Sequence, residues 1–312
     1  MCGIYGFSFL PGEMSEGARA ILASKLAEFN DERGGHSWGL VRVGDGADPS
    51  ALVIERGLGS ASPMAHRAIG ANTILGHTRW ATHGAKTVQN AHPFEVESIV
   101  GAHNGIVYNH DVLNEVYKRG CEVDSYHLFA HLAEGYDFDE IEGYGAIEWI
   151  DRSEGSGDVY LCRLQHGELA IRGIGSPEDP RGIAWSSDSE HLSDALDLAG
   201  VIDHFAYRID EGSVFVVRGA RLLVTSRELH LAESQPRKLV KWSDFLDPAV
   251  GTEMSMARYL DGVEDLADGD GVVIPDDDVE CEICGWWVPA SDDLGGICLN
   301  CEAPLSKMAA VG

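Results

Sequence analysis

The feature that most limits the fold is the order of apolar patterns over residues 2–232, where strand-like runs outnumber helical ones and do not alternate with them. Residues 4–10 form an apolar run bounded by glycine and proline, which is typical of a buried strand. Further strands are predicted at 37–43, 51–54, 73–76, 98–103, 159–164, 168–174 and 213–218. Helical spacing predicts helices at 16–30, 111–119, 125–134 and 189–198. A doubly wound sheet needs a helix between successive strands, so the pattern disfavours that architecture and predicts a mixed α and β domain.

The composition is that of a globular protein with an acidic surface. The 312 residues are 44% hydrophobic and 24% charged, and 51 acidic against 23 basic residues give a formal charge of −28. Because nucleic-acid binding depends on lysine and arginine to neutralise phosphates, neither nucleic acid nor an anionic membrane is expected as a partner. No apolar run approaches the roughly 20 residues of a membrane helix, and the N-terminus lacks the pattern of a signal peptide. We therefore expect a cytoplasmic location.

The first residue that could act in catalysis is Cys2, which becomes the N-terminal residue if Met1 is removed. That residue would then carry both a thiol and an α-amine with a pKa of roughly 7.7 to 8.0, which can accept a proton near neutrality. The amine can serve as the general base for its own thiol, as in N-terminal-nucleophile catalysis. Taken alone, Cys2 is equally compatible with a small buried residue that opens a strand.

Several short segments surround this cysteine with complementary chemistry. They are Arg33–Leu40, Gly76–Gly84, Asn90–Phe94, His103–Val107 and Val123–Ser125. Together they supply an arginine that can bind a carboxylate, an aspartate that can bind an ammonium, and an Asn-Gly pair that can direct two donors at an oxyanion. An arginine and an aspartate suit the two charged ends of an α-amino acid.

The motifs His-Thr-Arg-Trp-Ala-Thr-His-Gly, Asn-Ala-His-Pro and His-Asn-Gly-Ile, in this order, resemble the class II glutamine amidotransferase domain, closest to the glucosamine-phosphate synthase branch. The resemblance extends over roughly residues 2–220 and is densest between 76 and 125. It implies an α+β fold, a four-layer αββα N-terminal-nucleophile hydrolase sandwich of two mainly antiparallel sheets between helical layers. It also implies glutamine hydrolysis through a glutamyl thioester, without a cofactor.

The resemblance assigns a role to each matching residue. Cys2 is implied to be the nucleophile, and Asn104 and Gly105 the oxyanion hole. The implied substrate-binding residues are Arg79 for the α-carboxylate, Asp124 for the α-amine, Trp80 and Thr82 in the closing loop, and Arg33 beside the nucleophile. One segment departs from the pattern: Gly35-His36-Ser37-Trp38 stands where the family usually has Tyr or Gln, then Asp and two small residues.

Other cysteines and histidines have simpler interpretations. Five histidines, at positions 77, 83, 92, 103 and 110, are dense enough to suggest a metal site, but no pair has helical ligand spacing. The family uses such histidines to organise loops, which is the favoured interpretation here. Cys121 and Cys162 are predicted to be buried structural thiols.

The C-terminal part of the chain has a different composition. Residues 259–306 contain 13 acidic residues and no lysine or arginine, so residues 233–279 are predicted to be an acidic linker. The pattern Cys281-x2-Cys284-x13-Cys298-x2-Cys301 then supplies four thiolates, which is typical of a zinc ribbon over residues 280–303. A structural Zn²⁺ is favoured over a disulfide or redox role, because the expected compartment is reducing. Since a module this small lacks a core of its own, the metal would supply much of its folding free energy.

These patterns predict a glutaminase subunit that passes ammonia to a synthase on a separate chain. The alternative is a catalytically silent, zinc-bearing adaptor that retains the glutaminase fold. Because Trp286 and Trp287 form an apolar patch on an otherwise acidic ribbon, we expect the ribbon to dock protein rather than nucleic acid. The alternative for these tryptophans is packing on the ribbon or on the glutaminase domain.

Overall fold

The computed structural model describes residues 2–44, 51–155 and 157–232, together with 278–280 and 287–289. The chain divides into two units, Met1–Glu233 and Ser234–Gly312. In the second unit, β14 (Asp278–Glu280) pairs antiparallel with β15 (Trp287–Pro289). The four predicted zinc ligands Cys281, Cys284, Cys298 and Cys301, Trp286 and nearly all of the acidic linker lie outside the described residues.

The first unit contains two antiparallel sheets. Sheet 1 has the strand order β11-β9-β10-β1-β4-β2-β3, so the first strand of the chain lies at its centre. Its strands are, in chain order, β1 (Gly3–Phe9), β2 (Ser37–Val43), β3 (Leu52–Leu58), β4 (Thr73–Arg79), β9 (Ala170–Gly175), β10 (Pro180–Ser186) and β11 (His204–Ala206). Sheet 2 has the order β13-β12-β8-β7-β6-β5. Its strands are β5 (Phe94–Val96), β6 (Ile99–Val107), β7 (Gly143–Asp151), β8 (Val159–Arg163), β12 (Ser213–Arg218) and β13 (Arg221–Glu228).

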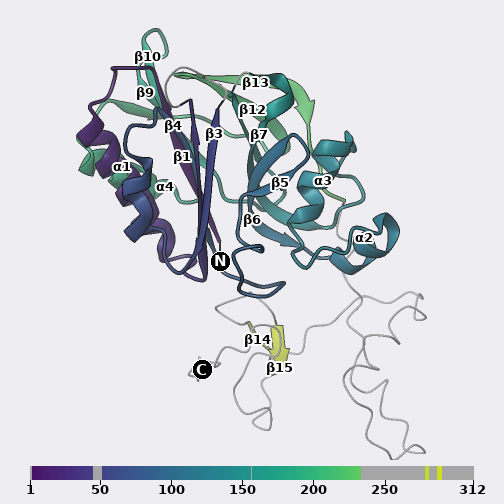
Figure 1. Cartoon of the computed structure of the whole chain (residues 1–312). Helices are drawn as coiled ribbons and strands as arrows, with labels where there is room; N and C mark the ends of the chain where they lie inside the picture. Colours follow the sequence, from purple (N-terminus) through teal and green to yellow (C-terminus); the bar gives the residue numbers. More distant parts are fainter. Residues whose placement is uncertain (1, 45–50, 156, 233–277, 281–286, 290–312) are drawn as a thin grey trace, which may run out of the picture. The chain divides into compact units, whose positions relative to one another are not determined.

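Helices cover the outer face of each sheet (Figure 1). Sheet 1 is covered by α1 (Glu16–Asp31), the 3₁₀ helix η1 (Ser62–Ala68) and α4 (Ser189–Leu198). Sheet 2 is covered by α2 (His110–Tyr117) and α3 (Tyr126–Glu134), and a short 3₁₀ turn, η2 (Arg152–Glu154), follows β7. No described helix has the length and apolar character needed to cross a bilayer.

Three apolar cores hold these layers together. On the outer face of sheet 1, Phe7 packs with Leu22 of α1 and Leu192 of α4. On the outer face of sheet 2, Ile147 packs with Phe129 of α3. A third core fills the space between the sheets, with residues from both of them: Ile4, Val41, Leu75, Val100, Ala146, Leu161 and Ile183. Two facing sheets enclosed by two helical layers are the predicted αββα sandwich.

One polar pair lies within the central layer. The Trp185 indole Nε1 donates to Glu148 Oε2 over 2.6 Å and so joins β10 of sheet 1 to β7 of sheet 2. The indole fits because Gly6, opposite it in register, has no side chain: a Cβ there would lie 2.3 Å from the ring. Burial raises the pKa of Glu148 well above its usual value, and the Trp185 hydrogen bond opposes this shift without cancelling it. Burial therefore favours the neutral form of this carboxyl group.

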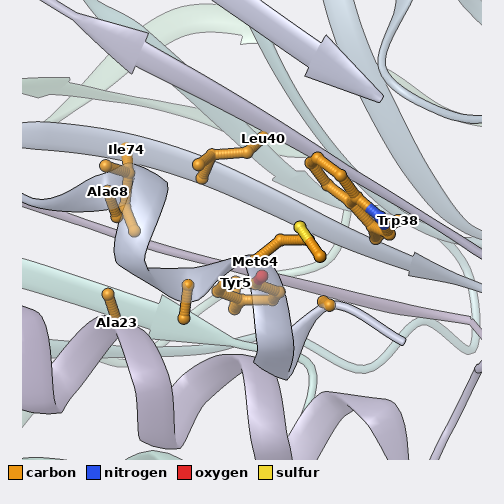
Figure 2. A pocket seen from close by; sticks show the side chains of 9 residues that line it. Tyr5, Ala23, Trp38, Leu40, Met64, Ala68 and Ile74 are labelled. Atoms are coloured by element: carbon orange, nitrogen blue, oxygen red, sulfur yellow. The ribbon is translucent and has the colours of Figure 1, made fainter. Parts of the chain in front are cut away.

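A small apolar cavity lies on the helix-covered outer face of sheet 1. Figure 2 shows Trp38, Leu40 and Ile74 from the strands facing Met64 and Ala68 of η1, with Ala23 of α1 beside them. Every side chain that lines it is apolar except for the Tyr5 phenol. It therefore belongs to the outer core of sheet 1.

The sequence predicted the first strand, β2, β12, α1 and α4 to within a residue or two. The predicted strands at 51–54, 73–76 and 98–103 are longer in the structure, where β3, β4 and β6 end at Leu58, Arg79 and Val107. The extended parts of β4 and β6 carry the polar motif residues, which do not look strand-like in isolation. The local sequence pattern did not indicate β5, β7, β10, β11, β13 or η1.

Candidate active site

Cys2 lies immediately before β1, at the centre of sheet 1. Its half-buried Sγ accepts the Trp80 backbone N–H at 3.3 Å and lies 3.5 Å from the Trp80 carbonyl oxygen. Burial raises the pKa of the thiol, whereas the Trp80 N–H and the nearby Arg79 charge act in the opposite direction. The thiol is therefore protonated near neutral pH, and a reaction through the thiolate requires a base.

Arg79 is the last residue of β4 and is 2% exposed. Its guanidinium donates to the His83 carbonyl oxygen and, at 3.3 Å, to that of Ala85, so it braces the segment 80–85, named here the Trp80 loop. Burial lowers the pKa of Arg79, and the charges of Cys2 and Asp124 oppose that shift. The arginine thus lies within electrostatic reach of both the thiol and the aspartate.

Asp124, just before α3, is 3% exposed. One carboxylate oxygen accepts the Val107 N–H at 2.7 Å, and the other lies 3.7 Å from His83 Nδ1 in the Trp80 loop. A buried carboxylate held on one side by the end of β6 has its second oxygen directed at the loop. This arrangement can bind an ammonium group.

Asn104 and Gly105 lie in the middle of β6, in sheet 2. The Asn104 amide donates to Ser187 Oγ at 3.0 Å, and the same Oγ accepts the Ile4 N–H of β1 at 2.9 Å. Ser187 therefore connects the Asn-Gly pair to the strand that carries the nucleophile. A Cβ on Gly105 would lie 2.0 Å from the Tyr144 carbonyl oxygen and 2.4 Å from His103 Nε2, so only glycine fits there.

Arg33 follows α1 and holds the nucleophile from its backbone. Its Nε donates to the Cys2 carbonyl oxygen at 3.1 Å, and its Nη2 pairs with Glu168. Two predicted substrate-binding residues remain open to solvent: Trp80 is 37% exposed, and Thr82 is exposed on the Trp80 loop. The structure thus brings Cys2 into contact with the predicted residues Trp80 and Arg33 and places Arg79 nearby.

Three buried histidines join β4, β6 and the segment before β5. The His77 Nε2 lies 3.1 Å from the His103 carbonyl oxygen, and the His92 ring packs on His77 with centroids 4.1 Å apart. Burial lowers the pKa of His77 to about 3 and also lowers the pKa of His92 and His103. These rings are neutral and buried, and they lie in or beside β4 and β6, the strands that carry Arg79 and Asn104.

A second cluster contains His110, Cys121 and His127, whose possible ligand atoms lie within 4.8 Å of one another. The Arg119 guanidinium donates to His127 Nδ1 at 3.1 Å, which leaves the ring proton on Nε2, facing Cys121 Sγ at 3.4 Å. Metal binding needs an unprotonated nitrogen at that position. This arrangement favours a hydrogen-bonded cluster, in which burial raises the pKa of Cys121 to about 11.

The comparisons with known proteins point to one class of enzyme. The chain is 32% identical over 221 residues to a glutamine–fructose-6-phosphate aminotransferase (isomerizing) of Gluconobacter oxydans, covering 67% of this chain and 34% of that protein. It is 32% identical over 225 residues to the protein of that name from Vibrio vulnificus, covering 69% and 35%, and 28% identical over 217 residues to that of Rhizobium meliloti. The chain spans about a third of the length of these relatives.

A solved structure agrees in fold. The glutamine phosphoribosylpyrophosphate amidotransferase of B. subtilis aligns with a TM-score of 0.51 and 18% identity, over 72% of this chain and 49% of that one. The chain carries a class II glutamine amidotransferase domain. No family model matches it.

Three residues with positions in the amidotransferase site were not predicted as site residues. Ser187 directly follows β10, and nothing in the sequence around it indicated a bond to Asn104. His36 was noted only as a departure from the family pattern, yet its ring contacts Trp80. Glu168 had no signal, since its pairing with Arg33 joins residues 135 positions apart.

Proposed function

We propose that residues 2–232 hydrolyse glutamine to glutamate and ammonia. The observation that carries this proposal is the position of Cys2 at the head of β1, with Asn104 tied to the same strand through Ser187. A nucleophile and an oxyanion donor fixed to one strand provide the first two requirements of amide hydrolysis.

The proposed reaction begins with transfer of the Cys2 thiol proton to the α-amine of the same residue, which requires that Met1 has been removed. The thiolate then attacks the side-chain amide carbon of glutamine. The Asn104 side-chain N–H and the Gly105 backbone N–H stabilise the resulting oxyanion. The C–N bond breaks, the leaving group takes the proton from the α-ammonium, and ammonia departs from a glutamyl thioester. Water, deprotonated by the amine, then attacks the thioester and releases glutamate and the thiol.

Substrate recognition is assigned to charged groups on either side of the thiol. Arg79 binds the α-carboxylate of glutamine, and Asp124 binds its α-ammonium. Trp80 and Thr82 close over the bound substrate, and Arg33 supports Cys2 from behind. The burial of Arg79 and Asp124 supports this assignment, because both charges are held in fixed positions away from bulk water.

We further propose that the ammonia acceptor is a synthase on a separate polypeptide, in the cytoplasm. The relatives are named for transfer to fructose 6-phosphate, and the chain spans about a third of their length. The support for a separate partner is the composition of residues 233–312, where two Cys-x-x-Cys pairs and the Trp286–Trp287 patch suit the docking of another protein.

The Cys-x-x-Cys pairs are proposed to hold a structural Zn²⁺ through Cys281, Cys284, Cys298 and Cys301. Four thiolates form the donor set of closed tetrahedral zinc sites. The pairing of Glu280 with Trp287 brings together the two ends of the segment that contains Cys281 and Cys284, as a zinc knuckle requires. We propose that this ribbon docks the synthase partner.

The test of the glutaminase proposal is glutamate release from glutamine by the full-length protein, with its N-terminal residue determined by intact mass. We expect activity only in protein that begins at Cys2, and none in Cys2→Ala. A glutamine-mimicking electrophile should label Cys2 alone. Activity in protein that retains Met1 would contradict the amine-as-base mechanism. A mature protein that is inactive even with its native partner would favour the silent adaptor.

A further inference from the structure

His36 occupies the position where the sequence departs from the family pattern, immediately before β2. Its backbone is fixed on both sides, because its N–H donates to the Arg79 carbonyl oxygen at 3.0 Å and its own carbonyl oxygen accepts the Gly59 N–H at 3.0 Å. The residue therefore continues the pairing of β2 with β4 and β3 beyond the ends of those strands. Its side chain emerges beside the first residues of the Trp80 loop.

The imidazole makes two different contacts with that loop. The Nδ1 accepts the Ala81 backbone N–H at 3.0 Å, and the ring stacks on the Trp80 indole with centroids 4.2 Å apart and planes inclined by 25°. Trp80 is also the residue whose backbone N–H donates to Cys2 Sγ. His36 thus holds two consecutive residues of the loop, the first of which contacts the nucleophile.

Arg79 supports the other end of the Trp80 loop. Arg79 braces the carbonyl oxygens of His83 and Ala85, which lie further along the loop than the residues that His36 contacts. When glutamine occupies the site, Arg79 is also assigned to the substrate carboxylate. Besides the Cys2 Sγ contacts with the Trp80 backbone, the His36 contacts therefore fix Trp80 and Ala81 without drawing on a substrate-binding group.

We propose that His36 is a positioning residue for glutamine binding, which holds the Trp80–Ala81 segment over Cys2 through its ring face and its Nδ1 acceptor. The inference rests on the proposed glutaminase function and assigns the residue a part in it. It predicts that loss of the imidazole raises the KM for glutamine more than it lowers kcat, because the contact acts on the loop and not on the reacting atoms.

The contact also has a defined dependence on pH. Three positive groups act on the ring: Lys86 and Arg79, on the segment that follows or ends β4, and the N-terminal amine. Burial lowers the pKa of His36 below 6.5, and these three charges lower it further. The Nδ1 acceptor is therefore present at neutral pH. As the pH falls below 6.5, protonation places an N–H donor against the Ala81 N–H and weakens the contact, so the KM for glutamine should rise in acid.

Two substitutions separate the two contacts. His36→Asn keeps an acceptor near the Ala81 N–H but loses the ring and the titration, whereas His36→Phe keeps a ring on Trp80 and loses the acceptor. We expect His36→Phe to raise the KM about threefold to tenfold, which corresponds to the net free energy of one hydrogen bond. His36→Asn should lose the rise of KM in acid. The matched control is His66→Asn, an exposed histidine on η1, which should leave the KM and its pH profile unchanged.

A readout that does not depend on catalysis is the tryptophan fluorescence of the full-length protein as a function of pH. The wild type should show a transition with a midpoint below 6.5 that is absent from both His36→Asn and Trp80→Phe. If the wild type hydrolyses glutamine and the His36 variants match it in KM and pH profile, the inference is wrong. An inactive wild type that still shows the transition would reject the glutaminase proposal and keep the contact. Absence of the transition from the wild type would reject the contact itself.

Discussion

The two sheets of the sandwich contribute to the site in different ways. Sheet 1 supplies groups at the ends of its strands: Cys2 before β1, His36 before β2 and Arg79 at the end of β4. Sheet 2 supplies Asn104 and Gly105 from the middle of β6, where the backbone pairs with Ala146 and Gly145 of β7. Cys2 and Arg79 therefore lie at strand ends beside the partly exposed Trp80 loop, whereas the oxyanion donors lie within a paired strand and Asp124 is bonded to the end of that strand.

This difference matches the chemistry proposed for each group. Oxyanion stabilisation depends on donors that are already oriented when charge develops, and a strand that pairs with β7 along its whole length meets that demand. Glutamine must enter and leave, so the groups that contact its charged end benefit from strand ends and a partly exposed loop. Ser187 joins the two parts, because its hydroxyl contacts both β1 and Asn104.

The largest effect should follow from removal of the rigid donor. Asn104→Ala should lower kcat by about 10² to 10³, the cost of one oxyanion donor, with a smaller change in KM. The measurement is steady-state glutamate release. Asn72→Ala, which removes an amide that contacts Arg19 outside the site, is the control. A variant that keeps nearly full kcat would show that sheet 2 is a scaffold and not a part of the catalytic machinery.

A smaller effect should follow from cutting the link between the sheets. Ser187→Ala leaves Asn104 in place but removes the hydroxyl that orients its amide, so we expect kcat to fall about tenfold and the free energy of unfolding to fall by about 1 kcal/mol. Glutamate release and thermal unfolding measure the two quantities. Ser187→Thr, which restores the hydroxyl, should recover part of kcat. Ser193→Ala on α4 is the matched control, since that hydroxyl contacts Arg172 and lies outside the site. Loss of stability without loss of kcat would mean that the link is only structural.

The smallest effect on hydrolysis is expected from a change outside both sheets. Deletion of residues 275–312 should leave glutamate release unchanged in the isolated protein, because the described strands of both sheets lie within residues 3–228. Coupled amidation by the native partner should be lost, and the bound zinc of the full-length protein, measured by elemental analysis, should disappear with it. Unchanged coupling after the deletion, or nucleic-acid binding by the full-length protein at physiological salt that the deletion abolishes, would reject the docking role.

The sequence could predict residues that lie in local motifs, but not contacts between distant segments. The site residues lie in contiguous motifs such as Gly76–Gly84, so their types and spacing were sufficient to identify the candidates. β7 was missed because two glycines and the buried Glu148 interrupt its apolar pattern, and the Trp185 partner that permits that burial is 37 residues away. β10 was missed because it begins with Pro180 and Arg181. Contacts between distant segments, such as those of Ser187 and His36, leave no local pattern to detect.

The central position of β1 also has a consequence for the order in which the protein is assembled. β1 pairs with β4 on one side and with β10 on the other, so its second neighbour is not synthesised until residue 186. At typical rates of translation the first strand waits on the order of 10 to 40 s with one edge unpaired. During that interval the site is incomplete, because Ser187, which contacts both β1 and Asn104, has not yet been made. The removal of Met1 proposed above can therefore precede completion of the site.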